Sequence, residues 1–391
     1  MEPDALSLPR LLAERGVSRR AFLKFCGGMA AALALPPSFG PRIAKALVNA
    51  PRIPLIWIEG QDCAGNTEGF LRASHPTAAE VILDILSVNY HETIMAPAGT
   101  AAEKSRTDTI AAFPKGYIAV VEGAVPIAQN GIYCTVGGRT FQSIVQEVCG
   151  NALATIAVGT CAFDGGLPAA SGGPTGAAGV AKMVPNATVI NLPGCPMNVQ
   201  NLTATIVHYL TFGSFPATDS MGRPLFAYGQ LLHDQCERRA HFDAGEYVLA
   251  WGDQGHRLGW CLYKMGCKGP ETFANCPTAR FNDRTSWPVK AGHGCVGCTM
   301  PAFWDQMSPF YRRLTNPPGF AVDVTADQVG LGLVGVVTAL TIAHGTGSYL
   351  RARSRSGGQT LEPPEEPAES SPGGPPPAAP AAPEAQGKEV S

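Results

Sequence analysis

The sequence predicts a doubly wound α/β domain over residues 51–215, and two observations point to this fold class. Apolar runs typical of buried strands occur at residues 53–58, 116–121, 154–158 and 188–192. Segments with a helical pattern lie between and after them, at residues 77–88, 141–149 and 197–210. Strands that are apolar along their whole length and alternate with helices are typical of a parallel sheet covered by helices on both faces.

The segment before this domain has the pattern of an export signal. The motif SRRAFLK begins at Ser18 and precedes the apolar run CGGMAAALAL, and small residues that suit cleavage follow at AKA (44–46) and VNA (48–50). Paired arginines before such a run indicate the twin-arginine route, which carries folded cargo. We therefore expect residues 1–50 to be a twin-arginine signal peptide. An exposed basic amphipathic helix is the alternative.

The composition of the chain changes after residue 215. Residues 216–318 are rich in glycine, proline, aromatic residues and cysteine and have little periodicity, as in YKMGCKGPETFANCP. Such a segment buries few aliphatic side chains, so we expect it to fold around metal centres.

The C-terminal part contains an apolar segment at residues 327–350, which Arg351, Arg353 and Arg355 follow. This segment reaches the roughly 20 residues that a membrane helix needs. The basic cluster predicts a cytoplasmic C-terminus, with the body of the protein on the other side. A buried helix of a soluble domain is the alternative. The Pro- and Ala-rich residues 351–391 predict a disordered tail.

The charge of the chain is close to neutral, with 29 basic and 31 acidic residues. This balance argues against binding to nucleic acid. Twelve cysteines are the more informative feature. They are too dispersed for a small disulfide scaffold and too numerous for an enzyme that merely tolerates thiols, so we expect most of them to be metal ligands.

Three of these cysteines come just after predicted strands. Cys63 follows PLIWIEG, Cys161 follows ATIAVGT and Cys195 follows TVINLPG. Ligands of an open parallel sheet bind at the carboxyl edge of its strands, so we expect these thiols to converge there. A glycine close to each cysteine lets the backbone approach closely and offers amides to sulfur; these glycines are Gly65, Gly159 and Gly194.

A second group of potential ligands contains His233, Cys236, Cys261 and Cys267. One histidine with three cysteines is common in structural zinc sites. Thiolates at uneven spacing also hold iron–sulfur clusters. The spacing of this group leaves both possibilities open.

A third group contains Cys276, Cys295 and Cys298. Three thiols suit a three-iron cluster, whereas His293 could complete a zinc site instead. The remaining cysteines of the body, Cys134 and Cys149, have no companion nearby in the sequence, so we expect them to be small buried apolar residues.

Seven segments of the chain together resemble one known family. They are WIEGQDCAGNTEGFLRASHPT, VEGAVP, VGTCAFDGGLPAA, NLPGCP, LLHDQCERRAHFDAGEY, WCLYKMGCKGPETFANCP and HGCVGCTMPAFWD. In this order and at these spacings they look like the small subunit of exported, membrane-bound [NiFe]-hydrogenases of the uptake type. The resemblance implies a flavodoxin-like domain followed by an irregular cluster-binding domain and a C-terminal anchor helix.

The resemblance also implies that this chain does not split hydrogen itself. In that family the nickel–iron centre belongs to a large partner subunit, and the small subunit passes electrons from H₂ oxidation through three iron–sulfur clusters. The implied acceptor is a membrane cytochrome b or a quinone-linked protein, reached from the extracytoplasmic face of the cell membrane. His344 would then be a candidate ligand for the haem of such a cytochrome.

Each ligand group takes a place in the family's pattern. The resemblance puts Cys63, Cys161 and Cys195 at the proximal [4Fe-4S] cluster, nearest the partner subunit. It puts the group of His233, Cys236, Cys261 and Cys267 at the distal [4Fe-4S] cluster. The medial [3Fe-4S] cluster would take Cys276, Cys295 and Cys298.

Asn66 departs from the family's pattern, because the fourth proximal ligand is usually a cysteine at this position. Asn66 could ligate iron through its amide oxygen, leave that iron to Asp62, water or another side chain, or mark a three-iron site. We expect a four-iron cluster with a non-cysteine fourth ligand. Gly65 and Gly166 stand where an oxygen-tolerant branch has extra cysteines, so that branch's six-cysteine cluster is not expected.

Two other functions are compatible with the cysteine pattern. One is an exported iron–sulfur electron carrier or scaffold without hydrogenase activity, and the other is a zinc-stabilised extracellular binding module. Glu68 is expected either to support the proximal site, to contact the partner protein, or to be a solvated carboxylate.

Overall fold

The computed structural model describes residues 17–50, 52–72, 86–282, 284–313 and 326–356. The chain divides into two units, residues 1–323 and 324–391, each of which is described by itself. The first unit contains the sheet and all twelve cysteines. The second contains one described helix, α17 (Ala326–Ser356).

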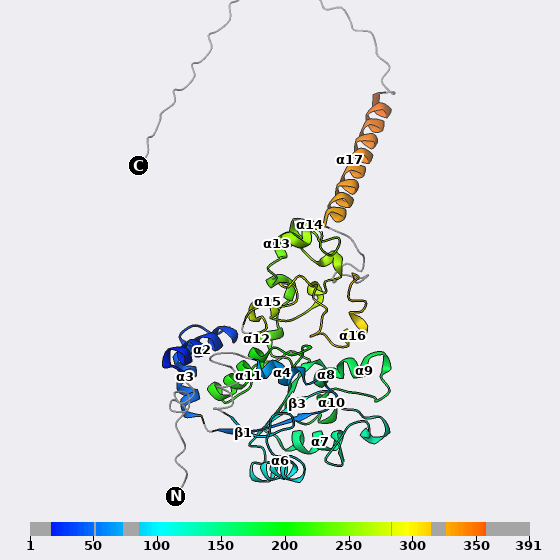
Figure 1. Cartoon of the computed structure of the whole chain (residues 1–391). Helices are drawn as coiled ribbons and strands as arrows, with labels where there is room; N and C mark the ends of the chain where they lie inside the picture. The colour runs from blue at the N-terminus through cyan, green and yellow to red at the C-terminus, as the bar shows by residue number, and fades with distance from the viewer. Residues whose placement is uncertain (1–16, 51, 73–85, 283, 314–325, 357–391) are drawn as a thin grey trace, which may run out of the picture. The chain divides into compact units, whose positions relative to one another are not determined.

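A five-stranded parallel sheet forms the centre of the first unit (Figure 1). Its strands are β1 (Ile53–Glu59), β2 (Leu86–His91), β3 (Ile118–Glu122), β6 (Ala154–Val158) and β7 (Val189–Leu192). Their spatial order is β2-β1-β3-β6-β7. This is the flavodoxin-like order, in which the chain winds first to one side of β1 and then to the other. The predicted doubly wound sheet is therefore confirmed.

Apolar cores lie on the two faces of the sheet. Side chains alternate between faces along a strand, so Ile56 and Ile58 of β1 pack on one face and Leu55 and Trp57 on the other. The first face is covered by α6 (Thr100–Ala112), α7 (Phe141–Asn151) and α10 (Val180–Met183). The second is covered by α4 (Gly65–Leu71), α11 (Val199–Phe212) and α12 (Leu225–Tyr228).

One predicted helix is partly wrong. Residues 86–88, predicted as the end of a helix over 77–88, form the start of strand β2, and residues 77–85 lie outside the described part of the chain. β2 is an edge strand that pairs only with β1. Its middle residues are only partly buried, so the strand lacks the continuous apolar run that marks the central strands.

The predicted signal segment forms a helical hairpin, α2 (Arg19–Ala32) and α3 (Phe39–Asn49). Ser18 caps α2 by accepting a hydrogen bond from the Ala21 amide at 3.2 Å. Cys26 and other apolar residues of the hairpin pack against Ala204 and Val207 of α11. The side chains of the arginine pair in SRRAFLK are exposed, so the motif is accessible in this structure.

The second half of the first unit contains little regular structure. Its helices are short: α13 (Arg239–Asp243), α14 (Gln254–Leu258), α15 (Cys276–Ala279) and α16 (Phe303–Gln306). A small core around Leu232, Leu262 and Trp287 includes Cys295, and Cys236, Cys267 and Cys276 pack against it. Two cysteines of this region, Cys261 and Cys295, are buried, and the other four are partly buried.

Helix α17 is long and apolar enough to cross a membrane, with a candidate span at Gly330–Ser354. Large apolar side chains such as Leu331, Leu340 and Ile342 are exposed on it. His344 lies within this span and is exposed. Residues 351–356, predicted as the start of the disordered tail, continue the helix, and the rest of that tail lies outside the described residues.

Candidate metal centres

The carboxyl edge of the sheet brings Cys63, Cys161 and Cys195 together. Cys63 follows β1, Cys161 lies in the first turn of α8 (Gly159–Asp164) directly after β6, and Cys195 follows β7. Desolvation and then the neighbouring Cys298, Cys161 and Cys63 raise the pKa of the Cys195 thiol to about 12, and desolvation raises the pKa of Cys161 to about 11. The Cys161 and Cys195 thiols therefore stay protonated unless a bound cation stabilises the thiolates, as at a metal site.

Asn66 lies at the same edge with its amide group already hydrogen-bonded. The residue is 7% exposed. Its Oδ1 accepts a hydrogen bond from the Met197 amide at 2.8 Å, and its Nδ2 donates to Glu122 Oε1 at 3.1 Å. An amide oxygen has two lone pairs, so the Asn66 oxygen retains one further acceptor site.

Glu122 holds the start of α4 and thereby positions Asn66. This carboxylate is fully buried at the end of β3. It accepts hydrogen bonds from the amides of Asn66 and Thr67 at 2.8 and 3.1 Å, and from the Thr67 hydroxyl at 2.7 Å. A carboxylate facing the free N–H groups of a helix start is stabilised there by hydrogen bonds and by the helix dipole.

Glycines lie closely against these groups. A side chain at Gly166 would place its Cβ 2.7 Å from Cys161 Sγ, and one at Gly65 would place it 3.1 Å from Cys63 Sγ. At Gly159, with φ +82°, a Cβ would lie 2.6 Å from Asn66 Nδ2. The edge therefore has no room for additional side chains beside these sulfur atoms.

The second ligand group lies in the irregular region. The amide of Cys236 donates to the His233 carbonyl at 3.3 Å, so the two side chains leave the same turn, η3 (Leu232–Gln235). Burial raises the pKa of Cys261 to about 12, with further contributions from Cys267 and Cys236. The structure thus brings the three cysteines of this group together.

The third ligand group lies next to both others. Burial, and then the neighbouring Cys298, raise the pKa of Cys276 to about 12. The pKa of Cys295 is raised by burial and then by Cys267, Cys298 and Cys276. Cys298 in turn lies near Cys195 of the sheet edge. The cysteines of the three groups therefore form a continuous series from the sheet into the irregular region.

Backbone amides point at the sulfur atoms of these groups. The Cys236 sulfur accepts from the Arg238 amide at 3.4 Å, and the Cys295 sulfur accepts from the Gly297 amide at 3.4 Å. Leu167, Tyr263 and Gly269 donate in the same way to Cys161, Cys261 and Cys267, respectively. N–H donors around cysteine sulfur are a feature of iron–sulfur sites, where they stabilise the anionic cluster.

Two cysteines lie apart from the groups. Cys149 is fully buried in the core beneath the sheet, and Cys134 packs against the same core. Cys149 is the small buried apolar residue that the sequence predicts, whereas Cys134 is only partly buried.

The donor set of the three thiol groups suits iron–sulfur clusters. Among the described residues, no three His, Cys, Asp or Glu side chains converge closely enough to hold one metal ion. A zinc ion needs four donors at about 2.0–2.3 Å. An iron–sulfur cluster is larger and takes one thiolate at each iron, so its ligands lie further apart. The donor set and the N–H donors fit iron–sulfur clusters.

Sequence reasoning missed two buried residues of this region. Glu122 ends the apolar strand IAVVE. A buried carboxylate needs hydrogen-bond partners, so an acidic residue in such a strand is itself a sign of a buried polar site. Thr160 is 2% exposed and precedes Cys161. The hydrogen-bond partners of Thr160 are distant from it in the sequence, so only the structure reveals them.

Glu68 is exposed and forms a surface ion pair with Arg72 at 3.2 Å.

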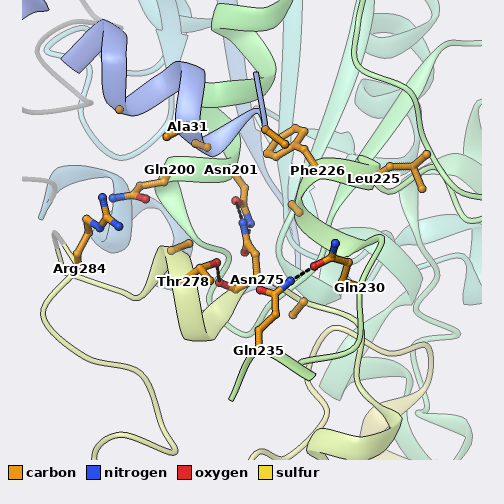
Figure 2. Close-up of a pocket in the computed structure, with 16 residues that line it drawn as sticks. Ala31, Gln200, Asn201, Leu225, Phe226, Gln230, Gln235, Asn275, Thr278 and Arg284 are labelled. Carbon is orange, nitrogen blue, oxygen red and sulfur yellow. Dashed lines mark hydrogen bonds between the residues drawn. The ribbon is translucent and has the colours of Figure 1, made fainter. Parts of the chain in front are cut away.

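A cavity of about 380 Å³ opens between α2, α11 and the loops of the irregular region (Figure 2). Asn201 and Asn275 point toward one another there and exchange amide hydrogen bonds at 3.2 and 2.8 Å. Alanines and amide side chains dominate the lining, and its described residues include no cysteine, histidine or carboxylate. This cavity is therefore separate from the metal-ligand groups.

Comparisons with known proteins agree with this arrangement. The family model for the C-terminal part of the NiFe/NiFeSe hydrogenase small subunit matches residues 228–311. The one described as "NADH ubiquinone oxidoreductase, 20 Kd subunit" matches residues 63–209. The first therefore covers most of the irregular region, and the second covers the sheet domain from Cys63 onward.

Similar proteins span most of the chain. The Hydrogenase-1 small chain of Escherichia coli K12 is 44% identical over 91% of this chain and 95% of its own length. The quinone-reactive Ni/Fe-hydrogenase small chain of Wolinella succinogenes is 44% identical over 85% of this chain and 96% of its own. The Ni-Fe-Se hydrogenase of Desulfomicrobium baculatum matches with a TM-score of 0.64, at 33% identity over 68% of this chain and 100% of that one. The chain thus belongs to the family of [NiFe]-hydrogenase small subunits.

Proposed function

We propose that this chain relays electrons from H₂ oxidation at the nickel–iron centre of a large partner subunit to an acceptor at the membrane. The observation that carries the proposal is the continuous series of three thiol groups. Bound iron–sulfur clusters would supply sites that each take up and release one electron. The chain's own residues hold these sites next to one another and direct N–H groups at their sulfur ligands.

The proposed cluster at the sheet edge is a [4Fe-4S] cluster held by Cys63, Cys161 and Cys195, with a non-cysteine fourth ligand. The proposed medial cluster is a [3Fe-4S] cluster held by Cys276, Cys295 and Cys298. His233, Cys236, Cys261 and Cys267 are the proposed ligands of a distal [4Fe-4S] cluster. The sheet-edge group is the one proposed to face the large subunit.

Metal analysis and electron paramagnetic resonance (EPR) on the anaerobically purified protein test the function. We expect co-purification with a larger, nickel-containing subunit, hydrogen-dependent dye reduction, and signals from three clusters. A lone iron–sulfur protein without a nickel subunit would instead favour an exported electron carrier or scaffold. Zinc without visible absorption from iron–sulfur centres would contradict both proposals.

Substitution of Asn66 by cysteine tests the fourth ligand. A thiolate adds one negative charge relative to a neutral amide, so the potential of the sheet-edge cluster should fall. The Asn66→Cys variant also loses the hydrogen bonds to Met197 and Glu122, which should lower stability by about 1–3 kcal/mol. Redox titration followed by EPR measures the potential and the cluster type.

The Asn66→Ala variant is the companion control, because alanine removes the amide without offering a thiolate. If Asn66 ligates iron, this variant should lose iron or show a three-iron signal. An unchanged cluster type and potential in both variants would show that position 66 neither ligates nor tunes the cluster.

The proposed location is the extracytoplasmic face of the cell membrane. Support comes from the exposed SRRAFLK motif at the start of α2 and from the apolar length of α17. The Wolinella relative is named quinone-reactive, which supports a cytochrome b or a quinone-linked protein as acceptor. His344, within the candidate span, is the proposed contact with the haem of such a cytochrome.

Removal of residues 326–391 tests the anchor. We expect the truncated complex to appear in the soluble fraction after cell lysis, because it lacks α17. Hydrogen-dependent reduction of a soluble dye should persist, whereas quinone reduction in membranes should be lost. A truncated complex that still sediments with membranes would contradict the anchoring role.

A further inference from the structure

Neighbouring thiol groups are joined by hydrogen bonds at both junctions. Between the medial and distal groups, the Cys295 amide donates to the Cys267 sulfur at 3.2 Å. Between the sheet-edge and medial groups, the link is made by the side chain of Thr160.

Thr160 holds the first junction from both sides. Its hydroxyl donates to the Cys298 carbonyl at 2.5 Å and accepts from the Gly194 amide at 3.0 Å. Its own amide donates to the Gly194 carbonyl at 3.0 Å. One buried side chain therefore links the residue before Cys195 to Cys298 itself.

We propose that Thr160 is a positioning residue for electron transfer, which holds the backbone beside Cys195 against Cys298. This inference rests on the proposed function. Electronic coupling falls off less along covalent and hydrogen bonds than across gaps between non-bonded atoms. The path from Cys195 runs along the backbone to the Gly194 N–H, across its hydrogen bond to the Thr160 hydroxyl, and across the hydroxyl's own hydrogen bond to the Cys298 carbonyl.

The step that Thr160 supports moves one electron and no atoms. The sheet-edge site is oxidised by one electron and the medial site is reduced by one. The Gly194 N–H and the Thr160 O–H keep their protons throughout. Loss of the Thr160 hydroxyl would leave the Gly194 amide and the Cys298 carbonyl without this partner, so the two backbone segments could separate and lengthen the path.

Thr299 provides a matched control. It is also buried, at 4% exposed, and it is also adjacent to a proposed ligand, Cys298. Its hydroxyl donates to the Phe273 carbonyl at 2.9 Å, within the irregular region. Substitution of either threonine by valine removes a buried hydroxyl beside a cluster ligand, but only Thr160 joins the two groups.

The experiment uses the purified complex with its large subunit. Iron content and EPR first establish that Thr160→Val, Thr160→Ser and Thr299→Val contain all three clusters. Freeze-quench EPR after mixing with H₂ then follows reduction of the sheet-edge and medial sites separately. We expect Thr160→Val to slow medial reduction several-fold without slowing sheet-edge reduction, and the other two variants to match the native rates.

Medial reduction at the native rate in a fully loaded Thr160→Val complex would overturn the inference. So would equal slowing in Thr160→Ser or Thr299→Val, because the bridging hydroxyl would then not be the cause. If the valine variant does not load its clusters, Thr160→Ala is measured instead. Alanine removes the same hydroxyl with a smaller side chain, and a native rate in that variant overturns the inference equally. Absence of clusters from the native complex would refute the proposed function itself.

Discussion

Replacement of Cys195 by alanine is expected to abolish hydrogen-dependent electron delivery while leaving the fold intact. Cys195 lies at the junction of two thiol groups, and its loss removes a proposed ligand of the sheet-edge cluster. Loss of an outer-shell partner costs about 10–100-fold at metal sites, and loss of a ligand should cost more. Hydrogen-dependent dye reduction and iron content of the purified complex measure the effect.

Cys149→Ala is the matched control for this variant. Cys149 is fully buried in the core of the sheet domain, away from the three groups, whereas Cys195 is exposed at the sheet edge. Its truncation should lower stability by about 1 kcal/mol through a small cavity and leave iron content and activity unchanged. Full iron content and activity in Cys195→Ala would show that Cys195 is not a ligand.

The sequence was sufficient to predict the sheet and the placement of three cysteines at its edge. The central strands are buried on both faces, so their apolar runs are continuous and easy to recognise. Because a parallel sheet aligns the carboxyl ends of its strands, the positions of Cys63, Cys161 and Cys195 followed directly. The fold class and this part of the candidate site were therefore predictable from local sequence patterns.

The features that the sequence did not predict depend on contacts between distant residues. β2 was missed because an edge strand has one strand neighbour and an incomplete apolar pattern. The hydrogen bonds of Asn66 were missed because its partners, Met197 and Glu122, are 131 and 56 residues away in the chain. The partnership of Thr160 with Cys298 spans 138 residues and leaves no local signal.

Glu122→Ala is expected to unfold the start of α4 locally and disturb the sheet-edge site. Its removal leaves the buried amides of Asn66 and Thr67 and the Thr67 hydroxyl without their carboxylate acceptor. Unsatisfied buried donors of this kind cost about 3 kcal/mol together, even after partial relaxation. That cost corresponds to a roughly hundredfold increase in local opening.

Hydrogen exchange of the amides at residues 65–71, measured on the assembled complex, reads out this opening. Glu68→Ala is the matched control, since Glu68 lies in the same helix but is exposed and forms only a surface ion pair with Arg72. That pair should contribute less than about 1 kcal/mol. If both variants exchange at the same rate, Glu122 does not hold α4. If only Glu122→Ala exchanges faster and its sheet-edge EPR signal broadens, the carboxylate supports the metal site by fixing the helix that carries Asn66.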